Sequence, residues 1–185
     1  MSLFRSAVLY TALALGANAA FADNAALEAL RDGDMKKLSF HADAKPVPEA
    51  ELLDAEGGAQ SLEQYRGKVV VLNFWATWCA PCRKEMPSLD RLQAELGGDD
   101  FAVVTVATGR NSVTAIRKFF EETGVESLPV LRDPQQALAR EMAVLGLPIT
   151  VILDREGNEI ARLRGDAEWD SDSAKAIVQA LVTGG

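Results

Sequence analysis

The amino-acid sequence predicts an α/β domain with a mixed central sheet and helices on both faces. Short β-branched runs alternate with segments of helical periodicity, and this order is typical of a sheet rich in parallel strands. Residues 68–75 form a nearly continuous apolar run, as in a central strand that is buried on both faces. The last two strands, 149–153 and 159–163, are separated by a turn at 154–158, which predicts an antiparallel edge.

Glycine and proline residues mark the boundaries of the other elements. The Gly-Gly pairs at 57–58 and 97–98 predict the turn of a hairpin and the end of a helix, respectively. Gly124 ends a second helix, and Pro134 suits the first turn of a third. In chain order, the expected elements before the last hairpin are a helix at 25–37, an extended linker at 43–48, a hairpin at 51–61, a strand at 68–75, a helix at 80–96, a strand at 101–107, a helix at 112–123, a strand at 128–132 and a helix at 134–142. A helix at 171–183 closes the chain.

Composition narrows the possible functions. The chain has 185 residues, enough for about one domain, and its 48% hydrophobic content is that of a globular protein. A formal net charge of −8 and the lack of a basic stripe argue against nucleic-acid binding, because an acidic protein repels phosphates. Two cysteines and one histidine are too few for a four-ligand Cys/His zinc site. We therefore expect no metal site and no cofactor, and we expect the histidine, His41, to lie in a solvated loop.

Residues 1–22 have the pattern of a secretory signal peptide. One arginine precedes an apolar run at 7–17, and residues 20–22 fit the small-x-small pattern before a cleavage site. The run is shorter than the roughly 17–25 residues of a membrane-spanning helix, so an uncleaved anchor is the second interpretation. Export would place both cysteines in a compartment that permits disulfides. Residues 23–48 are then expected to be a leader and linker, and 49–185 the folded domain.

Cys79 and Cys82 form a Cys-x-x-Cys motif where the buried strand meets the next helix. The N-terminus of a helix carries unpaired N–H groups and partial positive charge, which favour the thiolate of Cys79 and lower its pKa. Arg83 and Lys84 add positive charge nearby. Cys82 lies one turn into the helix, so the two sulfurs can approach and cycle between dithiol and disulfide. We expect Cys79 to be the exposed attacking thiol and Cys82 the buried resolving thiol; a static structural disulfide is the alternative.

The stretch around these cysteines resembles the active site of thioredoxin-fold proteins. Residues 73–87 read Asn-Phe-Trp-Ala-Thr-Trp-Cys-Ala-Pro-Cys-Arg-Lys-Glu-Met-Pro, which is similar to the exported TlpA-like, ResA-like and CcmG-like thiol–disulfide oxidoreductases. Residues 146–150, Gly-Leu-Pro-Ile-Thr, form a second matching motif. The resemblance covers about residues 50–185, and the leader and residues 161–169 look closest to TlpA. It implies a thioredoxin-like fold with a central strand–helix insertion.

The resemblance also implies roles for residues outside the cysteine pair. Pro148 would be the cis-proline opposite the disulfide, with the backbone of Leu147 and Pro148 pairing with a substrate strand beside Cys79. Trp78 lies next to the attacking cysteine in the sequence, so we expect it to form part of the exposed redox surface. We expect Trp78, Pro81 and Leu147 to contact the substrate.

Glu85 falls on the apolar stripe of its helix, together with Leu89, Leu92 and Leu96. A carboxyl group there, one turn beyond Cys82, is expected to be partly desolvated with a raised pKa. It could exchange a proton with the resolving thiol. The resemblance supports this role, because ResA-like and CcmG-like proteins carry an acid at this place. The alternative is a glutamate whose carboxylate reaches water at the helix surface.

These inferences predict a periplasmic thiol–disulfide oxidoreductase. By family likeness it would reduce a cysteine pair on a copper chaperone or oxidase subunit during copper-centre assembly, with cytochrome c maturation, through an apocytochrome, as the second possibility. A membrane protein of the DsbD or CcdA type would supply its electrons. Two other classes stay open: a disulfide oxidase or isomerase with the same site, and a Cu(I)-binding module that uses the two thiolates.

Overall fold

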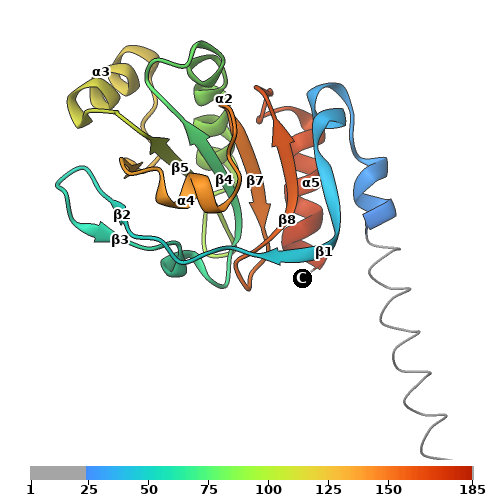
Figure 1. Cartoon of the computed structure of the whole chain (residues 1–185). Helices are drawn as coiled ribbons and strands as arrows, with labels where there is room; N and C mark the ends of the chain where they lie inside the picture. The colour runs from blue at the N-terminus through green and yellow to red at the C-terminus, as the bar shows by residue number, and fades with distance from the viewer. Residues whose placement is uncertain (1–23, 185) are drawn as a thin grey trace, which may run out of the picture.

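The computed structural model describes residues 24–184, and its centre is a single eight-stranded sheet with the strand order β1-β8-β7-β4-β5-β6-β2-β3 (Figure 1). The parallel pairs are β4 with β5 and β5 with β6, whereas the other neighbours are antiparallel. The strands are β1 (Ser39–Pro46), β2 (Leu52–Leu53), β3 (Ala59–Gln60), β4 (Val69–Trp75), β5 (Phe101–Thr108), β6 (Leu131–Asp133), β7 (Ile149–Leu153) and β8 (Asn158–Arg164). The expected mixed sheet is therefore confirmed.

Helices cover both faces of the sheet, and the alternation of side chains along β4 decides which face each residue serves. Val69, Val71 and Trp75 belong to the core cluster that contains buried residues of α2, α3 and α5. The intervening apolar residues of β4 belong to a second cluster, which contains Leu138 of α4. Figure 1 shows α4 in front of the central strands and α2 and α5 behind them. The helices are α2 (Ala80–Leu96), α3 (Val113–Thr123), α4 (Ala137–Glu141) and α5 (Asp172–Gly184).

The expected strand–helix insertion is the unit formed by β6 and α4, which lies between α3 and β7. The other predicted strands and helices of the central sheet layer begin and end within three residues of the observed ones. β4 and β5 are buried along their whole length, as their continuous apolar runs indicated. Among the described residues, no helix is long and apolar enough to cross a membrane. The expected signal peptide lies outside the described residues.

Two helix predictions were wrong in extent. The expected helix at 25–37 is divided into a short helix at 24–29 and a 3-10 helix, Gly33–Lys37, because Gly33 has a φ of +51° that an α-helix cannot accommodate. The expected helix at 134–142 is only α4, because Gln136 has a φ of +56°. The Asp133 carboxylate instead accepts hydrogen bonds from the N–H groups of Ala137 (2.8 Å) and Ala139 (3.0 Å) and so fixes where α4 begins.

The leader contributes to the sheet rather than only connecting to it. Residues 43–48 are extended, as expected of a linker, but most of them belong to β1, which pairs with β8 along the sheet edge. His41, expected in a solvated loop, lies on this strand, and its Nε2 atom is 2.7 Å from Oε1 of Glu159. The expectation missed this because strand pairing over such a sequence distance leaves no local signal. The domain limits at 22, 48 and 185 stay predictions.

We expect Asp133→Ala to lower the free energy of unfolding by about 1–2 kcal/mol, because it leaves two N–H groups at the start of α4 without acceptors. Urea denaturation would measure the change. Asp133→Asn keeps one side-chain oxygen as an acceptor and should lose less stability. Equal stability of Asp133→Ala and the unsubstituted protein would contradict this account.

Candidate functional site

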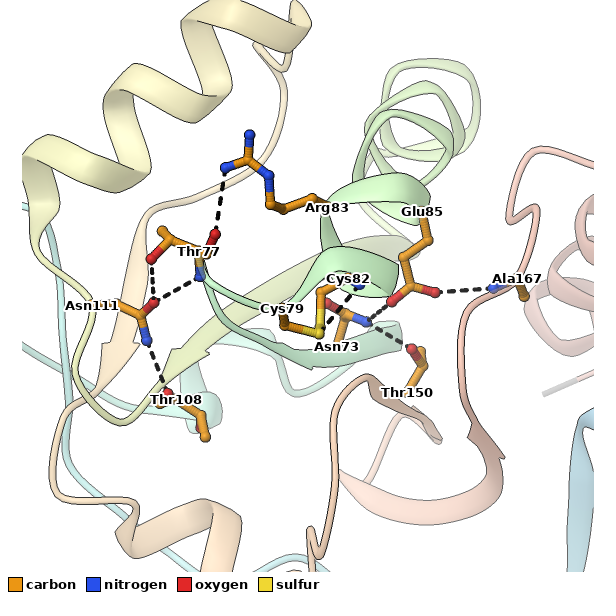
Figure 2. Close-up of a disulfide and its surroundings, with 10 residues drawn as sticks. All are labelled: Asn73, Thr77, Cys79, Cys82, Arg83, Glu85, Thr108, Asn111, Thr150 and Ala167. Atoms are coloured by element: carbon orange, nitrogen blue, oxygen red, sulfur yellow. Dashed lines mark hydrogen bonds between the residues drawn. A yellow bond between two sulfur atoms is a disulfide. The ribbon is translucent and has the colours of Figure 1, made fainter.

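Cys79 and Cys82 are joined by a disulfide at the N-terminus of α2 (Figure 2). Cys79 is the N-cap residue of α2, and its Sγ atom accepts a hydrogen bond from the N–H of Cys82 at 3.3 Å. Cys79 retains 6% exposure, whereas Cys82 is completely buried. Cys79 is therefore far less exposed than expected, because the disulfide and the surrounding turn cover it, but it is the outer residue of the pair and Cys82 the inner one, as predicted.

The turn between β4 and α2 is held by a residue that the sequence analysis missed. Oδ1 of Asn111 accepts hydrogen bonds from the N–H (2.8 Å) and the hydroxyl (3.0 Å) of Thr77, while its Nδ2 donates to the carbonyl oxygen of Thr108 (2.9 Å) (Figure 2). Asn111 thus ties the turn before Cys79 to the end of β5. The position of Asn111 just after a buried strand could have marked it as a candidate site residue, but the sequence does not indicate that its side chain binds Thr77.

Trp75 anchors the same turn from the core side. Its ring stacks on Phe120 with the centroids 5.7 Å apart and contacts Phe119 at 5.6 Å. Arg83 lies over the other side of this cluster, with its guanidinium 4.3 Å from the centre of the Phe119 ring. Lys84 forms an ion pair with Asp166 at 2.8 Å. The expected contribution of Lys84 to the charge around Cys79 is therefore reduced by a carboxylate, whereas Arg83 stays in the first turn of α2.

A groove beside Cys79 contains all three residues that were expected to contact the substrate. This cysteine groove has a volume of about 560 Å³, and its lining includes Cys79, Trp78, Pro81, Leu145, Leu147 and Arg140. Trp78 is 66% exposed and Leu145 is 94% exposed, so two large apolar side chains face solvent at its rim. No local pattern in the sequence marks Leu145 as part of this surface.

The peptide bond between Leu147 and Pro148 is cis, as the resemblance implied. Leu147 lines the cysteine groove, which brings the segment before the cis-proline to the side of Cys79. Pro148 itself is buried and borders a second cavity on the other side of this segment. The structure therefore brings together residues that lie almost 70 positions apart in the chain.

Glu85 is buried beneath the first turn of α2, with 1% of its surface exposed. Its Oε1 accepts a hydrogen bond from Nδ2 of Asn73 (2.8 Å), and its Oε2 accepts one from the N–H of Ala167 (3.1 Å) (Figure 2). Oε2 also accepts a hydrogen bond from Nε1 of Trp169 (3.1 Å). Desolvation raises the pKa of Glu85 to about 7, although the three hydrogen bonds oppose the shift. The expected burial and raised pKa are present, and the surface alternative is excluded.

The partners of Glu85 come from distant parts of the chain. Asn73 lies on β4, on the same face as Val71 and Trp75, and its Nδ2 also donates to the hydroxyl of Thr150 on β7 (2.8 Å). Trp169, which lies shortly before α5, donates its ring N–H to the carboxylate. No local pattern could have found this pairing.

Comparison with known proteins agrees with the fold and the site. A model of the AhpC/TSA family matches residues 44–160. The thioredoxin-like protein YneN of Bacillus subtilis (strain 168) is 37% identical over 117 residues, which cover 62% of this chain and 67% of YneN. The thiol–disulfide oxidoreductase ResA of Geobacillus thermodenitrificans (strain NG80-2) is 36% identical over 111 residues, covering 60% of this chain and 63% of ResA.

Solved structures show the same fold. The exposed lipoprotein thioredoxin Etrx1 of Streptococcus pneumoniae (strain TIGR4) superposes with a TM-score of 0.59 and 29% identity, over 74% of this chain and 99% of Etrx1. The thioredoxin-like fold is thereby confirmed. The fold and the cysteine pair define a thiol–disulfide oxidoreductase. The chain belongs to the AhpC/TSA family. The expected closer likeness to TlpA stays a prediction, because the relatives named here are YneN and ResA.

The raised pKa of Glu85 makes a prediction about stability. Below about pH 4.5 the carboxyl is protonated in both folded and unfolded chains, and between there and about pH 7 only the folded chain holds the proton. Stability from this group is therefore full at low pH and is lost as the pH rises through 7. From pH 4 to pH 8, we expect the unfolding free energy to fall by about 3 kcal/mol more in the unsubstituted protein than in Glu85→Gln.

Urea denaturation at a series of pH values would test this, with the disulfide intact throughout. Leu89→Ala, which disturbs the same buried side of α2 but removes no titratable group, is the control and should keep the pH dependence of the unsubstituted protein. Parallel curves for Glu85→Gln and the unsubstituted protein would show that Glu85 ionises normally.

Proposed function

We propose that this protein is an exported reductant of cysteine pairs in other proteins. One arrangement carries the proposal: a disulfide at the start of α2, open on one side to a groove and followed by a buried acid. Metallochaperones, oxidase subunits and apocytochromes need reduced cysteines before copper or haem is inserted. Among these, a copper chaperone or oxidase subunit is our first candidate substrate, and an apocytochrome is the second.

The reaction starts from the reduced protein, in which Cys79 is a thiolate. The N-terminus of α2 supports that charge, as does the N–H of Cys82, which already points at Sγ of Cys79. The thiolate attacks one sulfur of the partner's disulfide, forms a mixed disulfide and expels the partner's other sulfur as a thiolate. Cys79 is the group that can do this, because the sulfur of Cys82 has no contact with solvent.

Resolution of the mixed disulfide needs Cys82 to lose its proton. Glu85 lies three residues further along α2, on the same side of the helix, and with a pKa of about 7 it can accept that proton near neutral pH. The Cys82 thiolate then attacks Sγ of Cys79, and the electron pair of the broken bond leaves with the partner's sulfur, which takes up a proton. Two electrons pass to the partner, and the Cys79–Cys82 disulfide shown in Figure 2 is the product.

The buried acid also bears on the direction of electron flow. An ionised Glu85 repels a nearby thiolate and so makes the reduced pair less stable, which favours donation of electrons. Of the two cations in this turn, Lys84 is already paired with Asp166, and the guanidinium of Arg83 lies against the ring of Phe119. The periplasm is kept oxidising, so a reductant there must be recharged. We propose a membrane electron donor of the DsbD or CcdA type for that step and residues 1–22 as the export signal.

The reduction potential of the Cys79–Cys82 pair is the first test, measured by equilibration with dithiothreitol and glutathione. We expect a value near or below roughly −270 mV, as for thioredoxin. Glu85→Gln should be a weaker reductant, with the difference largest above pH 7, where Glu85 is charged. A value near roughly −120 mV, as for DsbA, would identify a disulfide donor and overturn the proposed direction.

The identity of the substrate requires a separate experiment. The reduced protein would be mixed with an oxidised periplasmic copper chaperone and, separately, with an apocytochrome whose haem-binding cysteines are oxidised. We expect faster reduction of the chaperone, with Cys82→Ser trapping a mixed disulfide to it. Faster reduction of the apocytochrome would assign the protein to cytochrome c maturation. Stoichiometric retention of Cu(I) by the reduced protein would instead favour a copper-binding module.

A further inference from the structure

Four exposed cationic side chains have neither an ion pair nor a side-chain hydrogen bond with any part of the chain that the structure describes: Lys45, Arg110, Arg140 and Arg164. Lys45 lies on β1, Arg140 on α4 and Arg164 at the end of β8. Arg110 follows β5, next to Asn111, which holds the turn before Cys79. Arg164 lies at the end of the sheet where β4 leads into the disulfide, because it pairs with Ile149 and Ile149 pairs with Phe74. Lys45 pairs with Glu159 and lies toward the opposite end of the sheet.

Three of these cations line the two cavities that flank the segment before the cis-proline. Arg140 is the only charged residue in the lining of the cysteine groove, among the residues described. Lys45 and Arg164 line the second cavity, which also has a volume of about 560 Å³ and which we call the proline cavity because Pro148 borders it. Leu145, Gly146 and Leu147 belong to both linings, so the two cavities are adjacent.

The carboxylates of the proline cavity do not neutralise these cations. Glu159 is held by Arg162, whose Nε and Nη2 atoms lie 2.7 and 2.6 Å from its two oxygens, and by His41. Burial by itself would raise the pKa of Glu159, but the contacts with Arg162 and His41 hold it below its usual range. Its charge is therefore already balanced within the fold. Glu141 is the other carboxylate in the lining, and it faces solvent.

The sign of this surface is opposite to that of the whole protein. The chain has a net charge of −8, yet Arg140 lines the cysteine groove, and Lys45 and Arg164 line the adjacent proline cavity. Glu141 is the only unpaired carboxylate among the described residues of the two linings. Elsewhere, exposed lysines such as Lys36, Lys37 and Lys84 are paired with carboxylates. Unpaired charges grouped at a groove can select a partner of opposite charge at little cost in stability.

We propose that Lys45, Arg140 and Arg164 bind an acidic segment of the protein substrate that begins next to the cysteine attacked by Cys79, with Arg140 in the cysteine groove and Lys45 at the far end of the segment. The segment would run from the cysteine groove across Leu145 toward the proline cavity, with its apolar side chains against Trp78 and Leu145 and its carboxylates toward the three cations. This inference rests on the proposed function, since it names the chemistry of the substrate at the same site. Like other interactions between exposed charges, it weakens with added salt.

Peptides of matched composition test the inference. Two oxidised peptides would share the same cysteine pair and apolar residues. One would carry three aspartates spaced along the segment that extends from the first cysteine, and the other would carry three lysines at the same positions. The reduced protein should reduce the acidic peptide about tenfold faster at low salt, and this ratio should approach one at high salt. The triple variant Lys45→Gln, Arg140→Gln, Arg164→Gln should also bring the ratio close to one.

A control variant with the same change in net charge shows whether location matters. Lys36→Gln, Lys68→Gln and Lys175→Gln together remove three cations that line neither cavity. This variant should keep the preference for the acidic peptide. Equal ratios in the two triple variants, or no preference in the unsubstituted protein, would overturn the proposed acidic segment.

A binding measurement separates this inference from the proposed function. Versions of both peptides with serine in place of cysteine cannot exchange disulfides, so their affinity for the oxidised protein reports docking alone. Tighter binding of the acidic serine peptide, lost in the Lys45, Arg140 and Arg164 variant, would support the acidic segment even if the protein reduced neither cysteine peptide. Failure to reduce either cysteine peptide would contradict the proposed reductase function, whatever the binding result. Equal affinity for both serine peptides would overturn the acidic segment while leaving the reductase function intact.

Discussion

The site depends on one structural constraint, the junction at which the fully buried strand β4 ends and α2 begins. Because β4 is buried on both faces, the position of its last residue, Trp75, in the core is fixed. The hydrogen bonds of Asn111 hold the turn that follows. Cys79 then has to cap α2, where the helix terminus favours a thiolate. Cys82 is placed inside the first turn and is buried as a consequence.

The same junction explains why an acid can be buried nearby. Asn73 occupies the one polar position of β4 on the face toward α2, and it meets Glu85 one turn beyond Cys82. Trp169 and Ala167, from the segment before α5, complete the set of donors. Since desolvation outweighs these hydrogen bonds, the acid titrates near neutral pH, where it can exchange a proton with a thiol.

Most of the fold could be predicted from local patterns, and the exceptions share a cause. The buried strands, α2 and the terminal hairpin have strong periodicity or clear boundary residues. The lengths of α4 and of the N-terminal helix did not follow the pattern, because the left-handed conformations of Gln136 and Gly33 interrupt the chain there. The pairing of β1 with β8 was missed because its partners lie more than a hundred residues apart.

The sequence by itself determined the chemistry of this protein: a Cys-x-x-Cys pair at a strand–helix junction, an acid on the apolar stripe of the same helix and a proline before a strand. These features depend on neighbouring residues, whose spacing is set by the geometry of one helix or strand. Only the tertiary structure decided which donors hold Glu85, how Asn111 fixes the turn and which cations are left unpaired along the two cavities. Those properties depend on contacts between distant segments, whose packing no local spacing encodes.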